Sequence, residues 1–202
     1  MKLLYAPASP YSAKVRMAAH HLDMKLEPVV VVTADEPALL IDANPLGKIP
    51  TLIADDGRAV FDSRAIMQFL DRQSDHKLYP RKGEERDEAE ALEALCDGIT
   101  DCLLAIVYER RLRPEDKIHQ PMIDRQWRKV ERGLDRLNAE MPKLGPKSGA
   151  GLHGGHFALA ALIGYLMLRF AGQWENGRTV LTAWPAKFAK RFPDFLELKP
   201  QG

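Results

Sequence analysis

The fold of this chain is decided near its N-terminus, by the stretch Ser9-Pro10-Tyr11-Ser12-Ala13-Lys14-Val15-Arg16. A short apolar run from Leu3 to Tyr5 precedes it and has the length of a strand. The residues after it have helical character, and proline fits the first position of a helix because its missing N–H costs nothing there. Ser9 is therefore predicted to lie at a strand-to-helix turn, where free N–H groups and the helix dipole favour an anion.

This turn carries two small polar residues three positions apart, with proline second. The pattern resembles the Cys-Pro-Tyr-Cys redox turn of thioredoxin-like folds, but serine replaces both cysteines, at Ser9 and Ser12. The thiol chemistry is therefore lost, while the anion-binding geometry is compatible with serine. An ordinary helix cap is the alternative interpretation, because serine before proline is common at helix starts.

Composition narrows the class of protein. Hydrophobic residues make up 46% of the 202 residues, which is enough for a sizeable core, and the net charge of +1 gives no argument for nucleic acid or a membrane surface as a partner. The two cysteines, Cys96 and Cys102, have neither a zinc spacing nor a disulfide framework. We expect free thiols, no metal and a reducing cytoplasm.

Targeting and membrane signals are not evident. The N-terminal segment is too short and too interrupted by proline for a signal peptide. The longest apolar run, Phe157 to Leu168, is shorter than the roughly 20 residues that a bilayer requires. We therefore expect a soluble cytoplasmic protein.

The first 80 residues predict a small mixed sheet. After the first strand and helix, the pattern predicts a strand at 26–32, a short helix at 38–42, strands at 51–53 and 59–61 joined by an Asp-Asp-Gly turn, and a helix opened by Asp62 and Ser63. The strand-helix-strand unit predicts parallel pairing and the hairpin predicts antiparallel pairing. Such a sheet with helices on its faces is typical of thioredoxin-like folds.

The remainder, 81–202, is predicted to be all helical. A charged linker at 81–90 leads into a helix that ends in arginines before Pro114, followed by an amphipathic helix around 127–141, a loop at 142–155, an apolar helix at 157–170 and a last amphipathic turn or two around 184–192. The helix at 157–170 is apolar nearly all round, so we expect it at the centre of a helical core. The chain therefore divides into two predicted domains, 1–80 and 81–202.

Taken together, these features resemble the cytosolic glutathione S-transferases, and the resemblance covers nearly the whole chain. Its motifs are the serine turn at 9–16, the Asn-Pro-Leu-Gly-Lys-Ile-Pro loop at 44–50, Phe-Asp-Ser at 61–63 before a helix, and the all-helical second half. The group that it resembles most is the bacterial transferase-like proteins with serine in the first turn. The resemblance implies a thioredoxin-like α/β domain followed by an all-α domain.

The resemblance also implies a glutathione site. Pro50 would be a cis-proline, since cis is common only before proline, and the backbone of Ile49 would pair with the cysteinyl part of glutathione. Asp62 and Ser63 would hold the γ-glutamyl end, although an N-cap is an alternative role that is compatible with binding. Lys48 would reach the glycyl carboxylate.

Ser9 would donate a hydrogen bond to the glutathione sulfur. A free thiol has a pKa near 8.5, so only about 3% is thiolate at pH 7, whereas a donor and a helix N-terminus could lower the pKa by about 2 units. The thiolate would then attack an electrophilic carbon or a peroxide. Tyr5 and Tyr11 are rival hydroxyl groups; Tyr5 lies within the strand, and Tyr11 could line the cleft.

The second-substrate pocket is less determined by the sequence. The resemblance nominates Tyr11, Leu104, Tyr108 and Trp174, but ordinary core packing is the alternative for each of the last three. Members of the family also carry a Ser/Thr-x-x-Asp capping box at the start of the buried helix. Alignment places Ala158 and Ala161 at those positions, which predicts a lost cap, with His156 as a weak substitute.

The resulting functional prediction is a glutathione-dependent transferase or peroxidase acting on a small hydrophobic electrophile or hydroperoxide. A non-catalytic binding or regulatory protein of the same fold is the alternative. A thiol-disulfide reductase is disfavoured by Ser9, because serine cannot form a mixed disulfide. A homodimer is also predicted, because the helix at 84–113 carries apolar residues beyond one stripe and the resemblance implies that it pairs with the partner's first domain.

Overall fold

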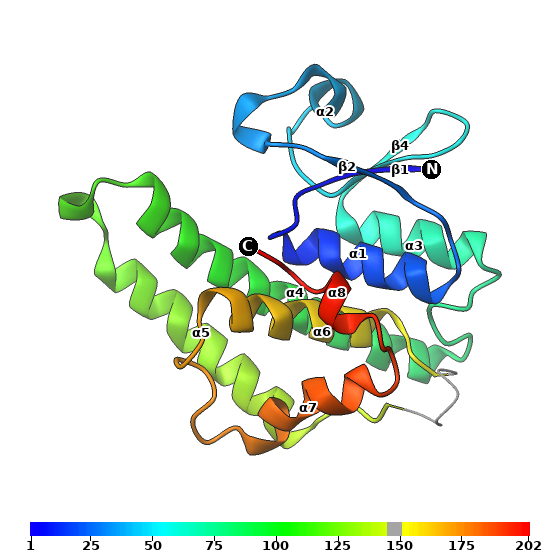
Figure 1. The fold of residues 1–202 in the computed structure, drawn as a ribbon. Helices are drawn as coiled ribbons and strands as arrows, with labels where there is room; N and C mark the ends of the chain where they lie inside the picture. The colour runs from blue at the N-terminus through cyan, green and yellow to red at the C-terminus, as the bar shows by residue number, and fades with distance from the viewer. Residues whose placement is uncertain (145–150) are drawn as a thin grey trace.

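The computed structural model describes residues 1–144 and 151–202, and in these a mixed sheet with flanking helices precedes a group of helices (Figure 1). The first part contains β1 (Lys2–Tyr5), α1 (Pro10–His21), β2 (Glu27–Val30), α2 (Ala38–Ala43), β3 (Thr51–Ile53), β4 (Ala59–Val60) and α3 (Ser63–Gln73). The second contains α4 (Gly83–Leu112), α5 (Gln120–Ala139), α6 (Gly154–Arg169), α7 (Thr179–Ala189) and α8 (Phe195–Leu198). Short 3-10 turns occur at Thr33–Asp35 and Glu115–Lys117.

The four-stranded sheet has the order β2-β1-β3-β4. β1 pairs with β2 in parallel, and β3 pairs antiparallel with both β1 and β4, as the sequence predicts. Side chains alternate across β1: Leu3 packs into the main core with α1 and α3, and Leu4 packs against Leu40 of α2. Figure 1 accordingly shows α2 on one side of the sheet and α1 with α3 on the other.

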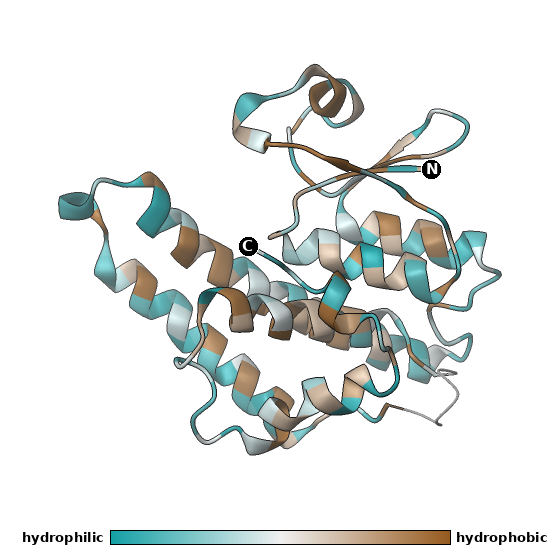
Figure 2. Ribbon diagram, viewed as in Figure 1, coloured by the Kyte–Doolittle hydropathy of each residue, from teal (hydrophilic) through white to brown (hydrophobic). Residues whose placement is uncertain are grey.

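Helix α6 is the centre of the helical part, as predicted from its apolar surface. Every residue from Gly154 to Leu166 is buried, and α6 contacts both α1 and α4. Figure 2 shows how hydrophobic residues concentrate along this helix. Gly155 permits the close approach to α4, because a Cβ at this position would lie 2.7 Å from the carbonyl oxygen of Ala89.

The start of α6 differs from the prediction. The helix begins at Gly154, with His153 as its N-cap, so Ala158 and Ala161 lie inside it, and the prediction that the capping box is lost at those two positions was wrong. His156 provides the capping contact: its Nδ1 accepts the His153 N–H at 3.2 Å, and its Nε2–H donates to the Lys143 carbonyl at 3.0 Å. Burial lowers the pKa of His156 to about 4, which keeps this ring neutral and its Nδ1 an acceptor.

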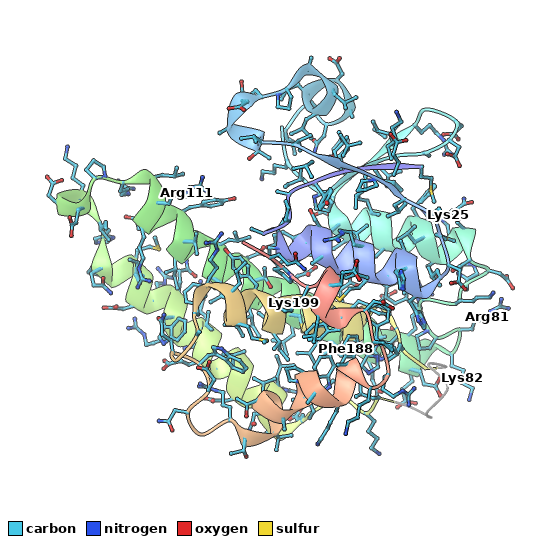
Figure 3. The ribbon with its side chains drawn as sticks, in the orientation of Figure 1. Lys25, Arg81, Lys82, Arg111, Phe188 and Lys199 are labelled. Carbon is cyan, nitrogen blue, oxygen red and sulfur yellow. The ribbon has the colours of Figure 1, made fainter. Side chains whose placement is uncertain are left out.

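The predicted loop at 142–155 and linker at 81–90 are both shorter than expected. Residues 145–150 lie outside the described part of the chain, and 154–155 are helical. Most of the charged linker is the first turns of α4, and Figure 3 shows Arg81 and Lys82 at its start. The turn before it is organised by the buried carboxylate of Asp71, which accepts the N–H groups of Leu78 and Tyr79 at 3.0 Å each.

The predicted boundary between residues 80 and 81 falls in the segment that joins α3 to α4, and as a domain boundary it stays a prediction. Within the described residues, no helix combines the length and apolar character needed to cross a bilayer.

Candidate functional site

Ser9 lies where the sequence predicts, at the N-cap of α1. Its Oγ accepts the backbone N–H of Ser12 at 3.2 Å, and Pro10 follows as the first helical residue. Because the oxygen acts as acceptor in the cap, the hydroxyl proton is left to donate to a further group. The side chain is half-buried, so it is accessible from outside. The cap interpretation and a donor role are therefore compatible in one geometry.

The loop before β3 is held by Asn44, a buried residue whose role was not predicted from the sequence. Its Nδ2 donates to the Lys48 carbonyl at 2.9 Å and to Thr51 Oγ1 at 3.2 Å, and its Oδ1 accepts the Leu46 N–H at 3.1 Å. An asparagine before Pro-x-Gly in a loop is a recognisable signal for such a role, because its side chain can bond to nearby backbone groups.

The Ile49–Pro50 peptide bond is cis, as the sequence predicts. Ile49 is half-buried and Pro50 is buried, while Lys48 is exposed beside them.

Asp62 and Ser63 form the N-terminus of α3, as predicted. Asp62 is the N-cap, and its Oδ1 accepts the Arg64 N–H at 3.0 Å. Ser63 is the first helical residue and is only 3% exposed. The first N–H groups of a helix have no intrahelical partner, so this end is a place where a carboxylate can bind.

Strand register brings these three segments to one edge of the sheet. Leu4 pairs with Thr51, so the end of β1 that leads to Ser9 lies beside the start of β3, which follows Pro50. Leu52 pairs with Val60, so the end of β4 that leads to Ser63 lies on the other side of β3. The serine turn, the cis-proline and the α3 N-terminus are therefore neighbours, although up to 54 positions separate Ser9 from Ser63 in the sequence.

A buried network of charges joins this edge to the helical part. Lys14 of α1 is 1% exposed, and its Nζ donates to Glu93 at 2.8 Å and to both carboxylate oxygens of Asp97 at 3.0 and 2.8 Å. Arg64 Nε donates to Asp97 at 3.0 Å, and the Tyr79 hydroxyl donates to Glu93. The network thus connects α1, α3 and α4. The sequence does not predict this network, because nothing local distinguishes Lys14 from a surface lysine.

Of the two rival tyrosines, Tyr11 has its hydroxyl engaged by a carboxylate, and Tyr5 has a cation over its ring. Tyr11 donates to Asp101 of α4, and burial together with that carboxylate raises the pKa of Tyr11 well above its usual range, so the phenol remains protonated. Tyr5 is half-buried, with the Arg16 guanidinium over its ring at 5.0 Å from the centroid.

The second-substrate residues are not brought together as one set. Leu104 and Tyr108 follow Asp101 along α4 at helical spacing, and Tyr108 is 51% exposed. Trp174 is instead 3% exposed and packs in the hydrophobic core of the helical part, which agrees with the alternative interpretation given for it. As a group, these assignments stay predictions.

Both cysteines are free; Cys96 is fully buried and Cys102 is half-buried. Burial raises the pKa of both thiols, most of all that of Cys96. In the described residues, no cluster of histidine, cysteine and carboxylate side chains has the arrangement of a metal site.

A mixed sheet with a serine turn and a cis-proline at one edge, followed by a helical bundle, defines the glutathione S-transferase fold. Residues 3–78 match the family profile for the glutathione S-transferase N-terminal domain. A glutathione S-transferase from Methylobacillus flagellatus, solved with glutathione bound, is 36% identical, covers 99% of both chains and superposes with a TM-score of 0.88. The chain belongs to the glutathione S-transferase family.

Two further relatives are informative. A glutathione transferase family member from Pseudomonas fluorescens Pf-5 is 31% identical, with 99% of both chains covered and a TM-score of 0.83, and its structure contains S-(propanoic acid)-glutathione. The uncharacterized GST-like protein YibF of Escherichia coli K12 is 28% identical over 170 residues, which is 84% of this chain and 83% of YibF.

Proposed function

We propose that this protein is a glutathione transferase that uses the thiolate of bound glutathione to attack a small hydrophobic electrophile, or to reduce a hydroperoxide. The observation that carries the proposal is the strand register, which gathers Ser9, Ile49 and Ser63 at one edge of the sheet. Similar proteins with glutathione in their structures support the choice of ligand.

In this proposal each end of glutathione has a partner. The γ-glutamyl carboxylate binds at Ser63 and the α3 N-terminus, and the ammonium group pairs with Asp62. The cysteinyl backbone pairs with Ile49, and Lys48 approaches the glycyl carboxylate. The sulfur lies beside Ser9, whose hydroxyl donates to it while the N-terminus of α1 favours the negative charge.

The chemistry that follows is nucleophilic attack by sulfur. With an electrophilic carbon, the S–C bond forms as the leaving group departs, or as an activated double bond gains a proton. With a hydroperoxide, the sulfur attacks the terminal oxygen, giving an alcohol and a sulfenic acid, which a second glutathione converts to the disulfide and water. The free state of Cys96 and Cys102 is compatible with a reducing, cytoplasmic location, which we also propose.

A panel of substrates tests the proposed activity. We expect glutathione-dependent turnover with at least one neutral electrophile, hydroperoxide or unsaturated carboxylate; acrylate belongs in the panel because a relative binds S-(propanoic acid)-glutathione. Turnover is measured as loss of free thiol, with the uncatalysed reaction subtracted. Glutathione binding without any turnover across the panel would favour the non-catalytic alternative instead.

Glutathione binding itself should depend on the α3 N-terminus. We expect a dissociation constant in the roughly micromolar-to-millimolar range, raised about tenfold or more by Asp62→Ala or Ser63→Ala, because each removes a charge-assisted contact. Calorimetry measures both effects. Asp56→Ala is the matched control, since Asp56 is an exposed carboxylate that bonds to Arg58 in its own turn. Equal affinities in all four proteins would rule out this site.

We also propose that the protein is a homodimer of two-fold symmetry. A cavity of about 410 cubic ångströms lies between α4 and α5; its lining includes apolar Leu95 and Ile99 and the cations Lys129, Arg132 and Arg136. In the first domain, Leu46 of the 44–50 loop is 68% exposed. Pairing the first domain of one copy with the α4–α5 cavity of the other would cover both surfaces.

Light scattering tests this assembly. The chain has a mass of 22.7 kDa, so a dimer should scatter as a species of twice that mass at micromolar concentration. Leu46→Lys should shift the population toward the monomer, because it replaces an apolar group with a positive charge that faces Lys129, Arg132 and Arg136 of the cavity. Leu196→Lys, at an exposed leucine on α8, is the control and should not. A wild-type protein that is monomeric at micromolar concentration would contradict the proposal.

A further inference from the structure

A second cavity lies outside the predicted glutathione site. It has a volume of about 640 cubic ångströms and lies between β1, β2, the second half of α1 and the end of α8. Figure 1 shows α8 beside α1, and Figure 3 shows Lys25 on the loop that leads from α1 to β2. Ser9, Ile49 and Ser63 are not among its lining residues. Its size is that of a small-molecule pocket, for which a volume of about 300–1,000 cubic ångströms is usual.

The lining combines an apolar surface with one half-buried cation. Leu3, Met24, Leu26 and Leu198 supply apolar surface. Arg16 also lines the cavity, held over the ring of Tyr5.

No carboxylate in the described residues forms an ion pair with Arg16, whereas Lys14, two positions earlier, binds two. A guanidinium that is half-buried and lacks an anionic partner is a binding group for a carboxylate, which it can meet with two parallel hydrogen bonds.

The other charged groups around the cavity do not neutralise Arg16. Lys25 adds a second positive charge and is exposed, and Asp23 is exposed on the same loop. His20 is already engaged, because its Nε2 lies 3.0 Å from the Asp194 carboxylate. Because the charges of Lys25 and Asp23 cancel, the cavity keeps one net positive charge, that of Arg16.

The C-terminal segment forms one wall of the cavity and is tied in place. The contact between His20 and Asp194 joins α1 to the residue before α8, and after α8 the Gln201 N–H donates to the Pro7 carbonyl at 3.0 Å. The wall that contains Leu198 is therefore attached to the first part of the chain at both ends. This makes the cavity a built feature of the folded chain rather than a gap beside a loose tail.

We propose that this cavity binds an amphipathic carboxylate, with its carboxylate on Arg16 and its apolar chain against Leu3, Leu26 and Leu198. The site goes beyond the proposed transferase function and is separate from it. Arg16 lies seven residues along α1 from Ser9, about 10 Å along the helix axis. Occupation of this cavity should therefore leave glutathione binding unchanged.

Calorimetry with sodium decanoate, at concentrations below those at which it forms micelles and with glutathione saturating, tests the proposal. Wild type should bind decanoate, and Arg16→Gln should weaken that binding about tenfold or more, the effect expected for losing a charged hydrogen-bond partner. 1-Decanol, which has the chain without the charge, should bind wild type and Arg16→Gln equally. Arg81→Gln is the matched control, because Arg81 is an exposed arginine paired with Asp75 and does not line the cavity.

A second variant keeps the test decisive if Arg16→Gln fails to fold. Met24→Glu places a negative charge on a half-buried lining residue and should also weaken decanoate binding without changing glutathione turnover. The proposal is overturned if decanoate does not bind wild type, if neither variant changes its affinity, or if glutathione displaces it. If wild type turned over no substrate of the panel, the proposed transferase function would be contradicted. The conclusion about decanoate binding would not be affected.

Discussion

Ser9→Ala is expected to reduce glutathione-dependent turnover by a factor of about 10 to 1000, the range for losing one donor to a stabilised anion. Glutathione binding should remain nearly intact, because Ile49, Asp62 and Ser63 still hold the peptide. The ultraviolet absorbance of the bound thiolate should titrate at higher pH in the variant. The physical reason is that the Ser9 hydroxyl stabilises the thiolate and not the thiol, so its loss raises the pKa of the bound sulfur.

Three matched variants separate this effect from damage to the helix. Ser9→Thr keeps both the hydroxyl donor and the cap, and should retain turnover. Ser12→Ala removes a buried hydroxyl that has no hydrogen-bond partner in the described residues, while the Ser12 N–H to Ser9 is kept, so it should also retain turnover. Ser9→Cys should form a mixed disulfide when oxidised glutathione is added, with one molecule of reduced glutathione released, because a thiol at a helix N-terminus has a lowered pKa and its thiolate attacks the disulfide. If the thiolate of bound glutathione titrated at the same pH in wild type and Ser9→Ala, Ser9 would be only a helix cap and would not stabilise the thiolate.

The sequence predicts the elements of the sheet well because residues typical of turns lie at the ends of each element. Pro10 marks the start of a helix, and Asp55-Asp56-Gly57 marks the turn that joins two strands. Between such turn residues lie apolar runs that have the length of a strand. The residues of the candidate site, Ser9, Pro50 and Ser63, each lie at such a boundary between elements. Their roles toward glutathione, however, are implied by the resemblance to the family and not by these local patterns.

What the sequence does not predict depends on contacts between distant segments. The cap of α6 is a local contact between His153 and His156, which does not have the usual Ser-x-x-Asp pattern, and the bond that holds the His156 ring goes to the Lys143 carbonyl, 13 positions earlier. The partners of Lys14 lie 79 and 83 positions later in the chain. A helical pattern shows that Lys14 and Glu93 each lie on a helix, but only the packing of α1 on α4 shows that both are buried.

Lys14→Met is expected to lower the free energy of unfolding by about 3–5 kcal/mol, the usual cost of removing one partner from a buried ion pair. The variant leaves Glu93 and Asp97 buried, at 5% and 3% exposed, without the cation that both contact. Arg64 and Tyr79 still donate to these carboxylates but do not replace the lost charge at the centre of the network. Urea denaturation monitored by circular dichroism measures the change.

Lys2→Met is the control for the loss of a lysine as such. Lys2 is exposed, and its Nζ lies 3.6 Å from Glu27, so its removal should cost less than about 1 kcal/mol. Adding Glu93→Gln to Lys14→Met should recover part of the loss, because it removes the carboxylate whose ion pair Lys14 formed, whereas Asp97 keeps its ion pair with Arg64. If Lys14→Met is instead as stable as Lys2→Met, water or a rearranged Arg64 must compensate both carboxylates. The network would then not be what holds α1 and α3 against α4, and the edge that carries Ser9 and Ser63 would depend on apolar packing alone.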